Sequence, residues 1–182
     1  MQIITGKYRA RKLVGVDSTD TRPTLARVKE SVFNLIFDKI EGKIVLDLFA
    51  GSGAYGAECI SRGAEEVFFV DRAEKAIKTI KLNTQKMTEK FEIIKSSFLE
   101  ALSAFEKRNV KFDLVFLDPP YDSDFALKAL DALRNKKILN KGATIVVEHK
   151  LANDLQNLPD CYIIKKSRKY GIAYIDILEF LE

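Results

Sequence analysis

The chain has 182 residues, 47% of them hydrophobic, and a formal net charge of +4 at pH 7. This predicts one domain with a substantial apolar core. Apolar runs are too short to span a membrane, and the first residues mix basic and apolar types too closely for a signal peptide, so we expect a cytoplasmic protein. Two distant cysteines, Cys59 and Cys161, and a single histidine, His149, argue against a disulfide framework and a zinc site, and no metal is expected.

Positive charge is concentrated at the start of the chain. Residues 1–30 hold seven basic and three acidic side chains, which leaves 23 of each sign in the remainder. Such asymmetry is typical of a surface that faces nucleic acid, although a solvated face would look similar. Strand-like segments at 2–4 and 13–16 flank the basic stretch and predict a small hairpin or arm. We expect the RNA or phosphate contacts to come from Lys7, Tyr8, Arg9, Arg11, Lys12 and Arg22.

A helix is expected next, because apolar residues from Leu25 to Ile36 recur at helical spacing, with Thr24 as N-cap. From residue 43, short apolar strands alternate with helices, which predicts a mostly parallel sheet covered on both faces. Strands are expected at 44–46, 67–70, 91–94, 112–117 and 144–147, and helices at 54–61, 73–83, 99–107 and 125–134.

The last part of the chain breaks this alternation. Strand-like segments at 162–164 and 173–180 are joined by Lys169-Tyr170-Gly171 and predict an antiparallel hairpin at the sheet edge. The expected fold is therefore α/β and Rossmann-like, with a seven-stranded, mostly parallel sheet in a single domain, residues 1–182. Residues 1–23 would form the basic arm, and residues 24–182 the helix and catalytic core.

The first strand leads into Asp47 and a glycine loop that matches the G-x-G-x-x-G pattern, Gly51-Ser52-Gly53-Ala54-Tyr55-Gly56. A dinucleotide is disfavoured, because a carboxylate at the mouth of the loop would repel a pyrophosphate. S-adenosylmethionine, with an ammonium and a sulfonium beside an adenosine, has no such conflict. Asp47 would face its amino-acid end, and Asp71, which closes the second strand, its ribose.

Asp118-Pro119-Pro120-Tyr121 follows the apolar run 112–117, where such a strand reaches the ligand-binding edge of an open α/β sheet. Two prolines fix φ and remove two backbone donors, so the carbonyl groups there remain available as acceptors. A carboxylate, rigid carbonyls and an aromatic ring suit a planar base that carries an amino group. The tetrapeptide alone would equally fit a strand end with Tyr121 packed on the core, but the acids of the first two strands at the same edge favour catalysis.

With these motifs the chain resembles the class I S-adenosylmethionine-dependent amino-methyltransferases, whose fourth motif is Asp/Asn/Ser-Pro-Pro-Tyr/Phe. Within them it is similar to the bacterial RsmD family, which methylates the exocyclic N2 of a guanine in small-subunit ribosomal RNA. The resemblance covers nearly the whole chain. It rests on the basic N-terminal stretch and on Arg22-Pro23-Thr24, Asp47 to Gly53, Ser61-Arg62-Gly63-Ala64, Asp118 to Tyr121, and Lys169-Tyr170-Gly171.

The resemblance implies a class I methyltransferase fold, S-adenosylmethionine as cofactor and small-subunit (16S) ribosomal RNA as partner, in a partly assembled 30S particle, with a monomeric enzyme. Asp118 and the Pro119 carbonyl would accept the amino hydrogens of the base and free its lone pair for in-line attack, while Tyr121 stacks on it. Ser96-Ser97-Phe98 departs from the pattern, since it has no acid for the adenine amino group, although Ser97 can accept a hydrogen bond. The cofactor-binding residues implied are Asp47, Phe49, Gly51, Gly53, Asp71, Arg72, Ser97, Phe98 and Asp118.

Three alternatives remain. A DNA adenine or cytosine amino-methyltransferase would share these motifs but normally adds a recognition domain. A protein-glutamine methyltransferase would more typically carry Asn in place of Asp118. A non-catalytic RNA-binding ribosome-assembly factor would gain nothing from three carboxylates that face an anionic polymer. A second basic cluster, Lys165, Lys166, Arg168 and Lys169, is also explained by charge protection of an edge strand.

Overall fold

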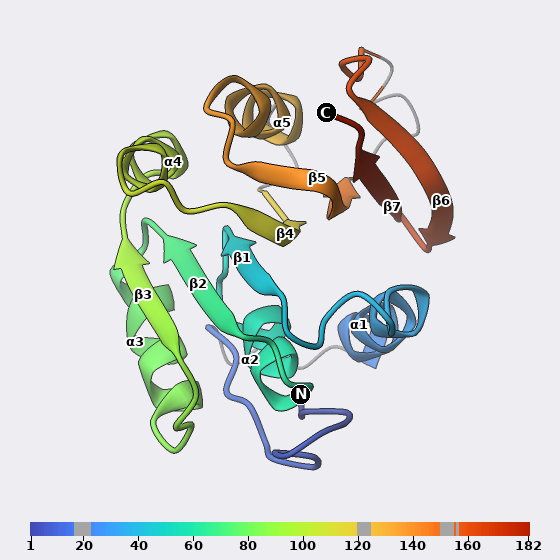
Figure 1. Ribbon diagram of the computed structural model, residues 1–182. Helices are drawn as coiled ribbons and strands as arrows, with labels where there is room; N and C mark the ends of the chain where they lie inside the picture. Colours follow the sequence, from blue (N-terminus) through green and yellow to red (C-terminus); the bar gives the residue numbers. More distant parts are fainter. Residues whose placement is uncertain (17–22, 120–124, 150–154, 156) are drawn as a thin grey trace.

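The computed structural model describes residues 1–16, 23–119, 125–149, 155 and 157–182. Strands and helices alternate through most of the chain (Figure 1). The elements are α1 (Pro23–Leu35), β1 (Ile44–Leu48), α2 (Ala54–Ser61), β2 (Glu66–Asp71), α3 (Glu74–Thr84), β3 (Phe91–Lys95), α4 (Phe98–Lys107), β4 (Phe112–Leu117), α5 (Phe125–Asn135), β5 (Leu139–His149), β6 (Tyr162–Tyr170) and β7 (Ala173–Phe180). Within the described part of the chain, no helix is long and apolar enough to cross a membrane.

The seven strands form one sheet in the order β3-β2-β1-β4-β5-β7-β6. The strands from β3 to β5 in this order pair in parallel, whereas β7 is antiparallel to both β5 and β6. The expected mostly parallel sheet with a C-terminal antiparallel hairpin is therefore confirmed. Because two antiparallel steps restore direction, β6 runs the same way as β4 and β5, and it ends at the carboxyl edge of the sheet.

Helices cover both faces of the sheet (Figure 1). The N-terminal segment, α1, α2 and α3 pack on one face, and α4 and α5 on the other. Successive side chains of β2 point to opposite faces, so Phe68 meets Phe105 of α4 edge-on at 5.2 Å, while Phe69 faces α2. A Cβ at Gly56 would lie 2.2 Å from the Phe69 ring. Only glycine lets α2 pack this close to the sheet.

The N-terminal segment packs on the domain and does not project as an arm. The expected hairpin pairing is present in a shorter form: Gln2 and Lys12 form an antiparallel bridge, with the N–H of Ile3 donating to the Arg11 carbonyl and the N–H of Leu13 to the Met1 carbonyl, both at 2.9 Å. The strands expected at 2–4 and 13–16 are not formed. Ile3 and Leu13 are buried in the core, with Met1, Ile4 and Tyr8 packed beside them. The backbone of the segment is held as well: the N–H groups of Ile4 and Thr5 donate to the Glu58 carboxylate at 2.8 and 3.0 Å. The N–H of Lys7 donates to the Ser61 carbonyl at 2.8 Å.

The expected hairpin link at the end of the chain was misplaced. Strand β6 continues through its lysines to Tyr170, and the turn is Gly171–Ile172, with Gly171 at φ 61°. The apolar pattern stops at Ile164, but backbone pairing with β7 does not depend on side-chain polarity, so the strand extends beyond it. Strand β5 likewise begins at Leu139, earlier than its apolar run suggested, because that residue pairs with Phe112 of β4.

Candidate active site

The loop after β1 is a backbone turn that needs left-handed residues. Phe49, Gly51 and Gly53 have φ values of 71°, 53° and 73°. The N–H of Gly51 donates to a carboxylate oxygen of Asp71 at 2.9 Å, and the second oxygen of Asp71 accepts from the N–H of Ala73 at 2.8 Å. The acid that closes β2 thus holds the glycine loop in place, beside the position where a ribose was expected.

Asp47 lies behind this loop. Its side chain is only 3% exposed and accepts a hydrogen bond from the N–H of Gly56 at 2.9 Å. Burial raises the pKa of Asp47 to about 7; the Gly56 N–H lowers it, and the negative charge of Asp71 raises it. Asp47 therefore fixes the start of α2 beneath the loop and does not line the cavity in front of it.

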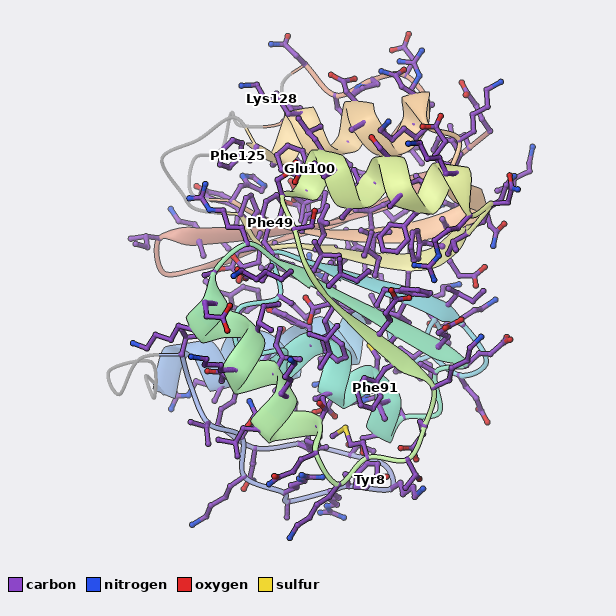
Figure 2. The ribbon with its side chains drawn as sticks, turned by 90° about the vertical axis from the view of Figure 1, so that its left-hand side faces the viewer. Tyr8, Phe49, Phe91, Glu100, Phe125 and Lys128 are labelled. Carbon is purple, nitrogen blue, oxygen red and sulfur yellow. The ribbon has the colours of Figure 1, made fainter. Side chains whose placement is uncertain are left out.

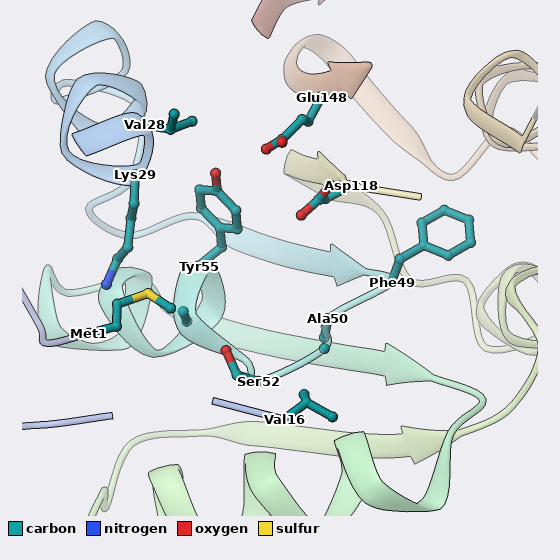
Figure 3. A pocket seen from close by; sticks show the side chains of 12 residues that line it. Met1, Val16, Val28, Lys29, Phe49, Ala50, Ser52, Tyr55, Asp118 and Glu148 are labelled. Atoms are coloured by element: carbon teal, nitrogen blue, oxygen red, sulfur yellow. The ribbon is translucent and has the colours of Figure 1, made fainter. Parts of the chain in front are cut away.

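A cavity of about 290 Å³ opens at the carboxyl edge in front of the loop (Figure 3). The glycine loop and the start of α2 form one wall, and α1 forms another. Met1 and Val16, from the N-terminal segment, complete the lining, with Val16 below the glycine loop in Figure 3. The lining comprises Met1, Val16, Val28, Lys29, Phe49, Ala50, Gly51, Ser52, Ala54, Tyr55, Asp118 and Glu148.

Two carboxylates share this cavity. Leu117 of β4 and Val147 of β5 are partners in the sheet, so Asp118 and Glu148, the next residue of each, lie side by side at its edge. Figure 3 shows both side chains pointing into the same space, opposite the Tyr55 hydroxyl. Surrounding protein raises the pKa of Asp118 well above its usual value, and the Glu148 and Asp47 carboxylates raise it further, although Asp118 is itself exposed to the open cavity. Pro119 is buried beside it.

Three aromatic rings gather next to the loop. The Phe49 ring lies 5.3 Å from that of Phe98 and 6.3 Å from that of Phe125, and the last two are 5.6 Å apart. Figure 2 shows Phe49 and Phe125 on the same side of the molecule. Such a set offers flat apolar faces that suit a purine ring. Phe125 was missed from the sequence; its signal is an aromatic residue at the start of the helix that follows the Asp-Pro-Pro-Tyr motif.

Comparison with known proteins places the chain in a family. The family model described as "Conserved hypothetical protein 95" matches residues 1–179. The chain belongs to this family. YlbH of Bacillus subtilis is 37% identical over 97% of both chains. The ribosomal RNA small subunit methyltransferase D of Haemophilus influenzae is 35% identical over 95% of this chain and 90% of its own. A solved structure from Escherichia coli superposes with a TM-score of 0.87 at 25% identity, over 100% of this chain and 98% of that one.

These matches confirm the RsmD family and the class I methyltransferase fold that the motifs predicted. Several of the family positions have other contacts in the structure. The Ser97 hydroxyl donates to Glu100 at 2.7 Å and accepts from its N–H at 3.4 Å, so it caps α4. Arg72 is exposed beside Asp71, and Phe98 packs in the aromatic group. Arg22 and Tyr121 lie outside the described residues, as does the side chain of Thr24.

The basic N-terminal stretch is mostly remote from the cavity. The Lys7 ammonium and the Tyr8 hydroxyl both contact Glu89, at 2.7 and 2.8 Å, in the segment that leads into β3. In Figure 2, Tyr8 lies near Phe91, across the molecule from Phe49 and Phe125. Arg9 and Lys12 are exposed, and the Arg11 guanidinium lies 5.8 Å from the Tyr8 ring. Lys12 pairs with Gln2, next to Met1 on the cavity wall, and is therefore the member nearest the site.

Lys29 of α1 is a cavity residue that sequence reasoning missed. Its side chain is 3% exposed, and its ammonium lies 3.0 Å from the Glu58 carboxylate and 3.2 Å from the Gln2 carbonyl. Burial lowers the pKa of Lys29, while Glu58 raises it. Glu58 is fully buried and also binds Arg62 at 2.9 Å. The available signal for this ion pair in the sequence was Glu58, an acid in the otherwise uncharged helix α2.

Proposed function

We propose that this RsmD-family protein transfers the methyl group of S-adenosylmethionine to the exocyclic N2 of a guanine in small-subunit ribosomal RNA. Family membership supports the methyltransferase activity and the ribosomal RNA substrate. A ribosomal RNA substrate in turn supports a cytoplasmic location. The observation that carries the choice of base is the pair of carboxylates, Asp118 and Glu148, that face one cavity.

The carboxylate pair favours guanine because ionised carboxylates only accept hydrogen bonds. On its Watson–Crick edge, guanine places its amino group beside a ring N–H, so Asp118 can accept from the amine and Glu148 from the ring. Adenine and cytosine place a ring nitrogen acceptor beside the amine, and a second carboxylate would repel it. This geometry disfavours the DNA adenine or cytosine amino-methyltransferase alternative.

The reaction proposed is a direct displacement. Asp118 and the Pro119 carbonyl accept the two amino hydrogens and localise the nitrogen lone pair, which attacks the methyl carbon as the carbon–sulfur bond breaks. The sulfur leaves as a neutral thioether, and the methylated amine, briefly cationic, gives one proton to Asp118. A carboxylate whose pKa is raised suits that acceptance. Negative charge around the cavity stabilises the cationic transition state.

The residues around the cavity fit S-adenosylmethionine, which supplies the electrophilic methyl group. The carboxyl groups of Asp118 and Glu148 line the cavity and make it acidic, which suits an ammonium and a sulfonium. Asp71 stands beside the loop for the ribose, and the group of Phe49, Phe98 and Phe125 provides faces for the adenine. Gly51 lines the cavity with its backbone, and at Gly53 a Cβ would lie 3.1 Å from Ile80 and 3.2 Å from the Phe69 ring, so glycine fits the tight space there.

The direct test uses small-subunit particles from a strain that lacks this protein. These particles, and in parallel naked small-subunit RNA and DNA from the same strain, are incubated with the protein and labelled S-adenosylmethionine, and the labelled RNA is digested and mapped by mass spectrometry. We expect one N2-methylguanosine, formed faster in a partly assembled particle than in naked RNA, because the target base must already be unstacked to reach the cavity. Label in DNA or protein, or no transfer with retained RNA binding, would support one of the alternatives instead.

A further inference from the structure

We propose that the edge strand β6 forms a second part of the site: a docking surface for the phosphate backbone of the substrate RNA next to the methylated base. The inference rests on the proposed function. The docking surface consists of Lys165, Lys166, Arg168 and Lys169.

The docking surface is densely cationic. All four side chains are exposed, and residues 163–169 of β6 are exposed without interruption. Among the described residues, Lys165 pairs with the half-exposed Glu179 at 3.5 Å, and the exposed Asp38 carboxylate interacts electrostatically with Lys166. One or two charges protect an edge strand from association. Four cations in five residues exceed that need and match a polyanion.

The direction of β6 brings this charge towards the cavity. Glu148 of β5 pairs with Ile175 of β7, and Ile175 pairs with Arg168. Arg168 is thus level with Glu148 and two strands away, about 10 Å by the usual strand spacing. An additional strand step leads to Asp118, which makes about 14 Å. Phosphates one or two nucleotides from a base held in the cavity would pass over this edge.

The cations flank the edge on both faces of the sheet. Lys166 donates to the Leu35 carbonyl of α1 at 3.0 Å, and Arg168 projects on the same face as Lys166, since strand residues alternate. Lys169 lies on the opposite face, with its ammonium 5.3 Å from the centre of the Tyr174 ring. The Tyr174 ring in turn stacks on His149 at 5.7 Å. This strand is anchored to α1 by a hydrogen bond between Tyr170 and Ser31, so the charges are carried on a rigid support.

The test neutralises the two residues nearest the cavity, Arg168→Gln with Lys169→Gln. The matched control is Lys86→Gln with Lys111→Gln, which removes the same charge from exposed positions at the amino edge. Both variants are compared with the parent protein for steady-state methylation of small-subunit particles lacking the modification, across a series of salt concentrations. Circular dichroism and calorimetric titration with S-adenosylmethionine check folding and the cofactor site.

We expect the β6 variant to raise KM for the particle roughly 10- to 30-fold near physiological salt, with kcat and cofactor affinity within about twofold. The log–log dependence of binding on salt should flatten by about 1.4–1.8, the value for two lost phosphate contacts. The control should match the parent protein. Equal KM and salt slope in the β6 variant and the control would overturn the docking surface, as would a higher KM with an unchanged slope. If the parent protein methylates no guanine, the proposed function itself fails, whatever the variants do.

Discussion

Two regions of this molecule carry four basic residues within a short stretch, and the structure uses them differently. In the N-terminal stretch, residues 7–12, the Lys7 ammonium and the Tyr8 hydroxyl are engaged by Glu89, near the start of β3. On β6, the cations are exposed, and the strand ends at the carboxyl edge, level with Asp118 and Glu148. Charge density in a sequence therefore does not tell which cations face a substrate. The direction of the strand that carries them does.

The acidic residues of these two regions also differ in their partners. Beneath the N-terminal segment, Glu58 is neutralised by Lys29 and Arg62 and satisfied by two backbone N–H groups. At the carboxyl edge, Asp47 and Asp71 accept from backbone N–H groups, and Asp118 and Glu148 point side by side into the cavity. Acid–base pairing thus stabilises one region, while the other keeps negative charge for a ligand.

The largest effect expected is at the carboxyl edge. Asp118→Ala should lower kcat for methyl transfer by roughly 10²- to 10⁴-fold, because it removes the acceptor of the amino hydrogens and of the proton. Affinity for S-adenosylmethionine should stay within a few-fold. Single-turnover methylation and calorimetric titration measure the two quantities. Loss of both to the same extent would mean that Asp118 is structural.

A second prediction concerns pH and Asp47. In the unfolded chain its carboxyl group loses its proton near pH 4, but in the folded protein only near pH 7. The folded state therefore binds more protons between these values, and stability should fall as pH rises from 4 to 7, by on the order of 4 kcal/mol. Asp47→Asn should remove this part of the fall, leaving what Asp118 contributes in the same direction. Urea unfolding at pH 5 and pH 8 compares the two proteins; an unchanged difference would contradict the assignment.

Replacing Glu58 tests the buried ion pairs beneath the N-terminal segment. Glu58→Ala leaves the Lys29 ammonium buried without its counter-charge and frees two backbone N–H groups, so the free energy of unfolding should fall by roughly 3 kcal/mol. Glu89→Gln is the control, because the Lys7 ammonium with which it pairs is exposed to water, and the ion pair should be worth less than about 1 kcal/mol. Similar losses in urea unfolding would show that the buried network is not the anchor of the N-terminal segment.

Whether a feature of these two regions could be predicted from the sequence depends on how far apart in the chain its contacting residues lie. The sheet, the glycine loop and the position of Asp118 follow from continuous apolar runs and from motifs within about ten residues, so local patterns were sufficient. The packing of the N-terminal segment depends on Glu58, 54 residues away from Ile4, and the cavity wall depends on Lys29 reaching the same acid. The pairing of Asp118 with Glu148 depends on strand register. None of these contacts leaves a periodic signal in the chain.

The smallest effect is expected from the N-terminal cations themselves. Replacing Lys7, Arg9, Arg11 and Lys12 together by Ala removes twice the charge of the β6 double variant. Yet Lys7 already pairs with Glu89, the turn lies across the molecule from Phe49 and Phe125, and only Lys12 lies next to a residue of the cavity wall. At most one phosphate contact should be lost, which corresponds to a change of about 0.7–0.9 in the log–log salt slope of particle binding. The same measurement on Arg168→Gln/Lys169→Gln gives the reference. A slope change near 3 for the N-terminal variant would mean that all four cations reach phosphates, and that the RNA extends across both edges of the sheet.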